Sequence, residues 1–297
     1  MDRTRKITSV TLWGAVANML LCIFKMAAGI VGRSSAMIAD AIHSLSDLFS
    51  DVVVLVMVRI AAKGRDVSHD YGHGKFETLA TAIISLILLV VGGRLMAGAV
   101  GNIHTVVKGG QLPQPGKIAF WAAIASIAVK EFLYHWTAHT GREAGSDTII
   151  ANAWHHRSDA LSSVGSAAGI GGAILFGGKW TVLDPIVGGI ISIIIIVVAV
   201  RMMIPALNEL TEASLPEETE KEISGILLSV NGISDAHALK TRKAGPDIII
   251  DVHIVVDPEM TVAKAHDLTD IAETALKKKF GEGTQISIHV EPDINSK

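Results

Sequence analysis

Apolar residues gather in six long segments between residues 10 and 205 and become sparse after about residue 209. A helix needs about 20 predominantly apolar residues to cross the hydrocarbon core of a bilayer, so each segment predicts a transmembrane helix. The six predicted spans are 10–31, 36–62, 77–100, 118–138, 147–176 and 181–205. The pattern therefore predicts an all-α membrane domain over residues 1–208, followed by a separate domain over residues 209–297.

Residues 209–297 instead show the shorter apolar segments and more frequent polar residues of a small water-soluble domain. A helix is predicted to begin at Pro216, where Glu217 and Glu218 suit a helix N-terminus, and to run to about Val230. Apolar alternation and a second amphipathic pattern then predict strands at 234–242, 247–256 and 285–290 and a helix at 261–280. The element order αββαβ indicates a small α+β fold for this part of the chain.

Composition supports the membrane assignment and narrows the class of protein. Hydrophobic residues make up 49% of the 297-residue chain and the mean hydropathy is +0.44, more than the core of a soluble domain requires. The net charge of −3 and the lack of a long basic tract argue against a nucleic-acid partner. Cys22 is the only cysteine, so neither a disulfide framework nor a thiolate metal site is expected.

The positive charges predict how the chain is oriented in the membrane. Most Lys and Arg residues lie at the N-terminus, in the polar segment 63–75, at Arg142 and beyond Arg201. Cytoplasmic segments carry such an excess, so both termini are predicted to face the cytoplasm, which agrees with an even number of spans. The first apolar stretch follows basic residues as a signal peptide would, but it is too long for one and no small-residue cleavage pattern ends it.

Two predicted spans share a His-x-x-x-Asp motif inside otherwise apolar sequence. His43 and Asp47 lie in the second span, and His155 and Asp159 lie in the fifth. Residues four apart share one face of a helix, so two facing motifs would present two imidazoles and two carboxylates. Such a set suits tetrahedral Zn²⁺, whereas Mn²⁺ or Mg²⁺ sites are more naturally all oxygen. A charge at mid-bilayer costs roughly 2.5–3.5 kcal/mol even on lenient scales, and a bound cation would remove that cost.

Other roles for the polar residues of the spans remain open. Each motif carboxylate could instead cap a helix or pair with a basic side chain, for which Arg157 is available. Asp40 and Asp51 extend the stripe of the second span; they would be accessory residues of the ion path, or would lie near helix ends in contact with water. His156 is predicted to point away from the face of His155. The remaining charged residues are interpreted as packing or interfacial residues: Lys25, Arg94, Lys130, Glu131 and Asp184.

Two further clusters of metal-ligating residues lie outside the spans. The segment 63–75 contains Asp66, His69 and His73, which would bind a second metal ion or simply belong to a polar loop. The tail contains six further candidates, which are His237, His253, His266, His289, Glu291 and Asp293. Three of these histidines lie on or beside predicted strands, where alternation can bring them together. A soluble domain with several histidines nevertheless often uses none of them to bind metal.

Several motifs together identify a family resemblance that covers nearly the whole chain. They are ADAIHSLSD and HHRSD in the second and fifth spans, YGHGK at Tyr71 to Lys75, the Asp184-Pro185 start of the sixth span, and the αββαβ tail. In these features the chain resembles the cation diffusion facilitators, and among them the bacterial ferrous-iron and zinc efflux type. The resemblance implies a homodimer with six spans per protomer, a cytoplasmic ferredoxin-like tail, and metal–proton antiport by alternating access.

The resemblance also implies three metal sites. They are a transport site of His43, Asp47, His155 and Asp159, a loop site of Asp66, His69 and His73, and a binuclear tail site at the dimer interface from His237, His253, His266, His289 and Glu291. His43 and Glu291 stand where close relatives have Asp; His43 makes the transport site similar to that of the zinc-selective branch. Lys75 resembles the family's lysine that forms a salt bridge between protomers, with Glu212 as its partner.

The expected function is that of a Zn²⁺/H⁺ antiporter in a bacterial cytoplasmic membrane, driven by proton influx. Metal binding needs neutral imidazole and ionised carboxylate, so metal and protons compete for the site near physiological pH. Fe²⁺, Cd²⁺ and Co²⁺ also suit such ligands, and Mn²⁺ suits them less. A membrane metal sensor that binds without transport is an alternative. An intramembrane metalloprotease would need a general base beside its metal, and the sequence has no HExxH motif, so no enzyme activity is expected.

Overall fold

The computed structural model describes the backbone of residues 3–61, 63, 66–144, 147–245 and 247–293. It describes the side chains of the same residues except 3–8, 50–61, 144, 147–148 and 151, so the predicted accessory residue Asp51 lies outside the described side chains. The chain divides into two compact units, Met1–Val52 with Ile84–Arg201 and Val53–Ile83 with Met202–Lys297.

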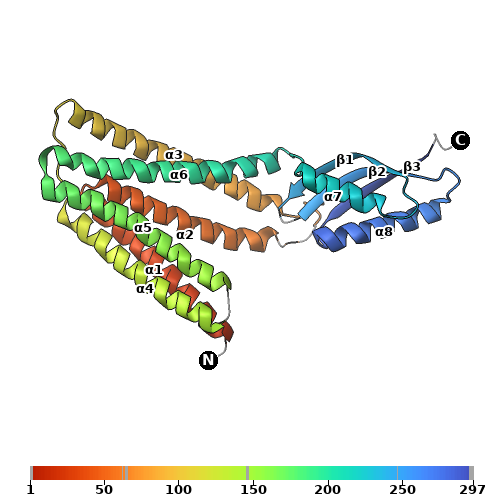
Figure 1. Ribbon diagram of the computed structural model, residues 1–297, viewed down its shortest axis with the longest axis horizontal. Helices are drawn as coiled ribbons and strands as arrows, with labels where there is room; N and C mark the ends of the chain where they lie inside the picture. Colours follow the sequence, from red (N-terminus) through yellow and green to blue (C-terminus); the bar gives the residue numbers. More distant parts are fainter. Residues whose placement is uncertain (1–2, 62, 64–65, 145–146, 246, 294–297) are drawn as a thin grey trace. The chain divides into compact units, whose positions relative to one another are not determined.

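Six long helices correspond to the six predicted spans (Figure 1). They are α1 (Arg3–Val31), α2 (Ser35–Ala61), α3 (Lys75–Val107), α4 (Lys117–Ala144), α5 (Asp147–Phe176) and α6 (Leu183–Leu210), the last preceded by a 3-10 helix, Gly178–Val182. The helical character of all six segments is confirmed. Most of the helices extend past the predicted spans, because hydropathy detects the apolar part of a helix and misses the polar turns that continue it.

Five segments within the described residues are long and apolar enough to cross a membrane. They lie in α1, α3, α4 and α5, and in the 3-10 helix together with α6. The five do not include α2, but the side chains of its residues 50–61 lie outside the described part of the chain, so this finding does not test whether α2 spans the membrane. Its passage through the membrane stays a prediction.

Small residues allow the helices of the first unit to pack closely. One buried cluster consists of Ala28, Ala36, Met37, Ala119, Ala122, Ala123, Ala167 and Ile170. A Cβ atom at Gly32 would lie 2.8 Å from the Cβ of Ala119, and one at Gly29 would lie 2.9 Å from Cγ1 of Ile38. Membrane helices associate through such close contacts. The packing brings α1, α2, α4 and α5 near enough for their polar side chains to interact.

Asp184, in the first turn of α6, caps the beginning of α2. Its buried carboxylate accepts hydrogen bonds from the Ser34 hydroxyl at 2.5 Å, the Ser35 N–H at 2.6 Å and the Ala36 N–H at 3.3 Å. The first N–H groups of a helix have no intrahelical partner, and a carboxylate from another helix satisfies them here. The interpretation of Asp184 as a packing or interfacial residue missed this capping role.

The end of the chain forms the predicted αββαβ arrangement. Its elements are α7 (Glu217–Leu228), β1 (Asp235–Ala244), β2 (Asp247–Val256), α8 (Val262–Phe280) and β3 (Gln285–Pro292). The sheet order is β1-β2-β3, antiparallel between β1 and β2 and parallel between β2 and β3. Both helices pack on the face that carries Ile250, Val252 and Ile254. Because successive side chains alternate, His253 lies on the opposite face of the sheet.

Replacing Asp184 should destabilise the first unit. Asp184→Ala leaves the buried Ser34 hydroxyl and two α2 N–H groups without their acceptor, which should lower the free energy of unfolding by about 1–3 kcal/mol. Thermal unfolding of the detergent-solubilised protein measures the effect. Asp184→Asn keeps one carbonyl acceptor and should lose less. Equal midpoints for the alanine variant and the wild type would contradict the capping role.

Candidate metal sites

The structure brings three of the four predicted transport ligands together. Ligand atoms of His43, Asp47 and Asp159 all lie within 4.8 Å of one another. The i,i+4 spacing on α2 puts His43 Nε2 4.0 Å from Asp47 Oδ2. The same spacing on α5 puts His155 Nε2 3.9 Å from Asp159 Oδ1, but His155 is not in the three-residue group and is half exposed. The arrangement offers one imidazole and two carboxylates, with a second imidazole beside them.

Asp47 has an oxygen that nothing in the described part of the chain satisfies. Its Oδ2 atom is buried and has no hydrogen-bond partner there. A buried carboxylate oxygen without a partner is costly unless a donor or a cation reaches it. The donor set and this unsatisfied oxygen fit a divalent cation between α2 and α5.

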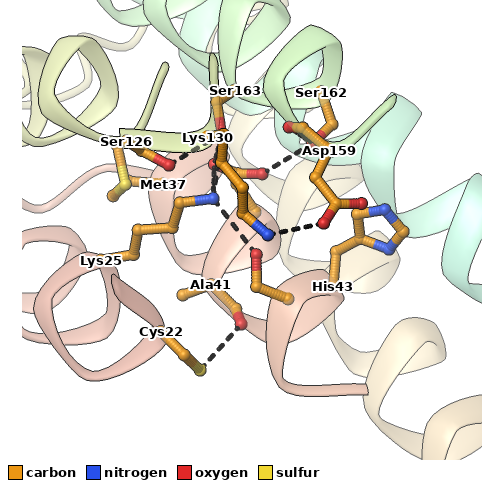
Figure 2. A network of polar contacts seen from close by, with 12 residues as sticks. Cys22, Lys25, Met37, Ala41, His43, Ser126, Lys130, Asp159, Ser162 and Ser163 are labelled. Atoms are coloured by element: carbon orange, nitrogen blue, oxygen red, sulfur yellow. Dashed lines mark hydrogen bonds and ion pairs between the residues drawn. The ribbon is translucent and has the colours of Figure 1, made fainter. Parts of the chain in front are cut away.

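Asp159 already has a cationic partner from a third helix. The Lys130 ammonium of α4 donates a 2.6 Å hydrogen bond to Asp159 Oδ2, and the two side chains are only 3% and 6% exposed. Figure 2 shows Lys130 reaching Asp159 beside His43. Arg157, the partner considered from the sequence, instead lies 3.8 Å from Glu131 and stacks over the Tyr134 ring at 4.6 Å. One predicted ligand is therefore held by a lysine.

A second buried lysine neutralises Asp40. The Lys25 ammonium of α1 lies 2.8 Å from Asp40 Oδ2 and donates to the hydroxyls of Ser163 at 2.9 Å and Ser44 at 3.2 Å. Ser162 and Ser163 of α5 donate to the two oxygens of Asp40 at 3.1 and 2.9 Å. Figure 2 labels Lys25, Ser162 and Ser163 of this network. Asp40 is therefore a fully satisfied ionic residue one helical turn from His43, rather than one in contact with water.

Sequence reasoning missed both lysines, although a signal was present. The sequence alone predicts packing or interfacial roles for Lys25 and Lys130, but each lies well inside an apolar segment. A buried ammonium needs a carboxylate partner, and the neighbouring spans offer Asp40 and Asp159. The sequence gives no spacing that tells which lysine meets which carboxylate, because the pairs join different helices.

His156 occupies a different environment from His155, as predicted. Its side chain is buried, and neither ring nitrogen has a hydrogen-bond partner among the described residues. Gly14 of α1 faces it, since a Cβ atom there would lie 3.6 Å from His156 Nε2. His156 does not join the ligand group.

The predicted loop residues converge. Ligand atoms of Asp66, His69 and His73 lie within 4.8 Å of one another, and the two imidazole rings are 4.4 Å apart. A local turn positions Asp66, whose Oδ1 accepts from the Ser68 N–H, the Ser68 hydroxyl and the His69 N–H at 2.6–2.9 Å. His73 Nε2 lies 3.4 Å from Asp66 Oδ2.

Hydrogen bonds from the Ser68 side chain and backbone lower the pKa of Asp66 to about 2. A carboxyl group with a depressed pKa stabilises the folded loop above its usual pKa of 3.8, and that contribution is lost only as the pH falls through about 2. Asp66 is therefore ionised throughout the physiological range, as a metal ligand would need to be.

Strand register aligns three of the tail histidines. His237 of β1 pairs with His253 of β2, which in turn pairs with His289 of β3. Glu291, two residues along β3, contacts all three: its carboxylate lies 3.3 Å from His237, 2.8 Å from His253 and 3.8 Å from His289. The β1 register shifts just after His237, where Ala238 has a positive φ of 51°. The row gives a cluster of imidazoles around one carboxylate.

His266 does not join this cluster in the described chain. It lies on α8, is exposed, and its Nε2 is 3.9 Å from Asp270 of the same helix. The compact group consists of His237, His253 and Glu291. The assignment of His266 to the tail site stays a prediction.

Lys75 and Glu212 form an ion pair within one chain. Lys75 Nζ at the start of α3 lies 2.7 Å from Glu212 Oε1, just after α6. The hydrogen bond and charge of Lys75, followed by the charge of Arg242, lower the pKa of Glu212. The family resemblance predicts this pair as a salt bridge between protomers; the structure shows the pair within one chain, and the bridge between protomers stays a prediction.

Comparison with known proteins identifies the family to which the chain belongs. The cation efflux transmembrane domain matches residues 11–211, and the cytoplasmic domain of cation efflux proteins matches residues 215–293. These two matches cover the helices that carry His43 and Asp159 and the sheet that carries His253.

Two curated relatives match along most of this chain. Metal tolerance protein C1 of Arabidopsis thaliana is 36% identical over 290 residues, which are 94% of this chain and 61% of that protein. The manganese efflux system protein MneP of Bacillus subtilis (strain 168) is 30% identical over 295 residues, 98% of each chain. A solved structure titled "Mode of Action of a Putative Zinc Transporter CzrB (Zn form)" is 37% identical and covers 28% of this chain and 96% of its own, with a TM-score of 0.26. The protein is thus a membrane protein of the cation diffusion facilitator family, the cation efflux transporters.

Proposed function

We propose that the protein exports Zn²⁺ from the cytoplasm in exchange for protons. The observation that carries the proposal is the ligand group of His43, Asp47 and Asp159, whose atoms lie within 4.8 Å on two helices of the membrane unit. His155, 3.9 Å from Asp159, supplies the fourth ligand after a small side-chain movement. Two imidazoles and two carboxylates form a tetrahedral set that Zn²⁺ accepts well.

The same ligands account for coupling to protons. A metal ion binds the deprotonated forms of imidazole and carboxylate, so protonation and metal binding exclude each other. Zn²⁺ from the cytoplasm displaces protons from the histidines, and protons arriving from the other side then release the metal. Between the two steps α2 and α5 rock together to expose the site to one side at a time. Proton influx drives metal efflux.

Mn²⁺ is the second candidate substrate. It is favoured by the similarity to a Bacillus manganese efflux protein along 98% of both chains. The oxygen ligands Asp47 and Asp159 suit Mn²⁺, but His43 and His155 suit Zn²⁺ better. Ligand chemistry therefore favours zinc, and flux measurements distinguish the two metals.

The distribution of positive charge and the family match support a proposal for the domains, the orientation in the membrane and the oligomeric state. We propose a transport domain over residues 1–208 and a metal-binding domain over residues 209–297, both termini facing the cytoplasm of a bacterial cell. The protein acts as a homodimer, in keeping with the match of residues 215–293 to the cytoplasmic domain of cation efflux proteins. The loop and tail clusters then face the cytoplasm, and metal in the tail tightens the dimer when cytoplasmic zinc is abundant.

Proteoliposomes that contain a zinc dye and a pH dye test the transport site. With an imposed pH gradient, the wild type should move Zn²⁺ and protons in opposite directions, and Asp47→Ala or Asp159→Ala should reduce flux to background because each removes a charged ligand. Glu217→Ala, which alters an exposed carboxylate on α7, is the matched control and should transport normally. Undiminished flux in both site variants would refute the assignment, and binding without flux would indicate a sensor.

Substituting His43 should change metal selectivity. His43→Asp replaces a nitrogen ligand by oxygen, so the ratio of Mn²⁺ flux to Zn²⁺ flux should rise by about tenfold or more. The control is His104→Asp, the same substitution at an exposed histidine in the last turn of α3 and outside the ligand group, which should leave the ratio unchanged. A wild-type protein that already prefers Mn²⁺ would contradict the zinc proposal.

The loop cluster should bind one Zn²⁺ per protomer. Asp66→Asn keeps the acceptor for Ser68 but removes the charge, so equilibrium dialysis should register the loss of that ion. Asp70→Asn neutralises an exposed carboxylate of the same loop outside the cluster and should retain it. Equal zinc content in the two variants would mean that Asp66 does not hold a metal ion and that the loop is simply polar.

A further inference from the structure

A ligand of the proposed transport site is occupied by the protein's own cation. Lys130 Nζ lies 2.6 Å from Asp159 Oδ2, and both side chains are almost completely buried. Lys130 comes from α4, whereas the ligand group comes from α2 and α5. The contact is therefore between the metal site and a helix that contributes no ligand to it.

An ammonium group and a divalent cation oppose each other at one carboxylate. Like charges a few ångströms apart repel strongly where water is excluded. A buried carboxylate without a cation is also costly, so Asp159 needs one of the two partners at all times. Lys130 meets this need when the metal is absent and works against the metal when it arrives.

We propose that Lys130 is a tethered competitor that sets the metal affinity of the transport site. Its ammonium holds Asp159 between transport cycles, must move off Oδ2 as the metal binds, and returns as the metal leaves. The inference rests on the proposed function, because it assumes that Asp159 is a metal ligand. Its consequence for transport is that the site binds metal weakly enough to release it.

The two buried lysines differ in how firmly they are held. Among the described residues, Asp159 is the one hydrogen-bond partner of the Lys130 ammonium. The Lys25 ammonium is bound by Asp40, Ser44 and Ser163 together. Asp40 is outside the ligand group, although it is one turn from His43. Fewer hydrogen bonds therefore hold Lys130 in place than hold Lys25, and Lys25 is a matched control with the same chemistry.

The test measures Zn²⁺ binding to the full chain in lipid nanodiscs by calorimetry at one neutral pH. His69→Ala and His253→Ala are introduced throughout to remove binding at the loop and tail clusters. Lys130→Met and Lys130→Gln should tighten Zn²⁺ binding by about tenfold or more, because they remove the opposing charge. Lys130→Arg keeps the charge and should bind as the parent does. Lys25→Met should change the affinity far less than Lys130→Met.

Each outcome separates this inference from the proposed function. Tighter binding with slower Zn²⁺ efflux at saturating metal in Lys130→Met supports the competitor role, because loss of a merely structural lysine would not strengthen binding. Unchanged or weaker binding in both neutral variants, while Asp47→Ala abolishes binding, overturns the role of Lys130 and leaves the site intact. Retained binding in Asp47→Ala overturns the site itself, and the inference with it. Thermal unfolding without metal checks that each variant is folded.

Discussion

Charges buried among membrane helices must be compensated inside the protein, and this requirement organises the first unit. Lys25 meets Asp40, Lys130 meets Asp159, and Asp184 satisfies the first N–H groups of α2. Each contact joins different helices, so the ionic residues help to fix which helices are neighbours. Close packing through Ala and Gly makes the contacts short enough to form.

The second unit relies on a different constraint, which is strand register. A three-stranded sheet brings residues far apart in sequence to one row, and the row here is His237, His253 and His289. The apolar side chains on the other face hold α7 and α8 and fix that register, because a slip of one strand by one residue would turn the histidine of that strand into the core. The stability of the core and the geometry of the candidate tail site therefore depend on the same alternation along β2.

The sequence predicted elements and motifs better than it predicted contacts between elements. The six helices and the αββαβ tail follow from local periodicity, and the His-x-x-x-Asp motifs lie on single helical faces for the same reason. The pairing of Lys130 with Asp159 depends on how α4 packs against α5, which no local pattern encodes. Family resemblance has its own limit at His266: it implies that this residue belongs to the tail cluster at a dimer interface, whereas within one chain His266 lies beside Asp270.

The charges around the proposed transport site explain why a lysine there matters. Lys25 and Asp40 cancel each other's charge, so the Lys130 ammonium is set against Asp47 and Asp159 and leaves one net negative charge when the histidines are neutral. With both carboxylates unopposed, the site would attract a divalent cation strongly and would retain it. With Lys130 in place, a divalent ion reverses the sign of the net charge instead of neutralising it. If the site transports metal as proposed, this opposing charge weakens the binding of the metal, and protons that arrive at the imidazoles then favour its release.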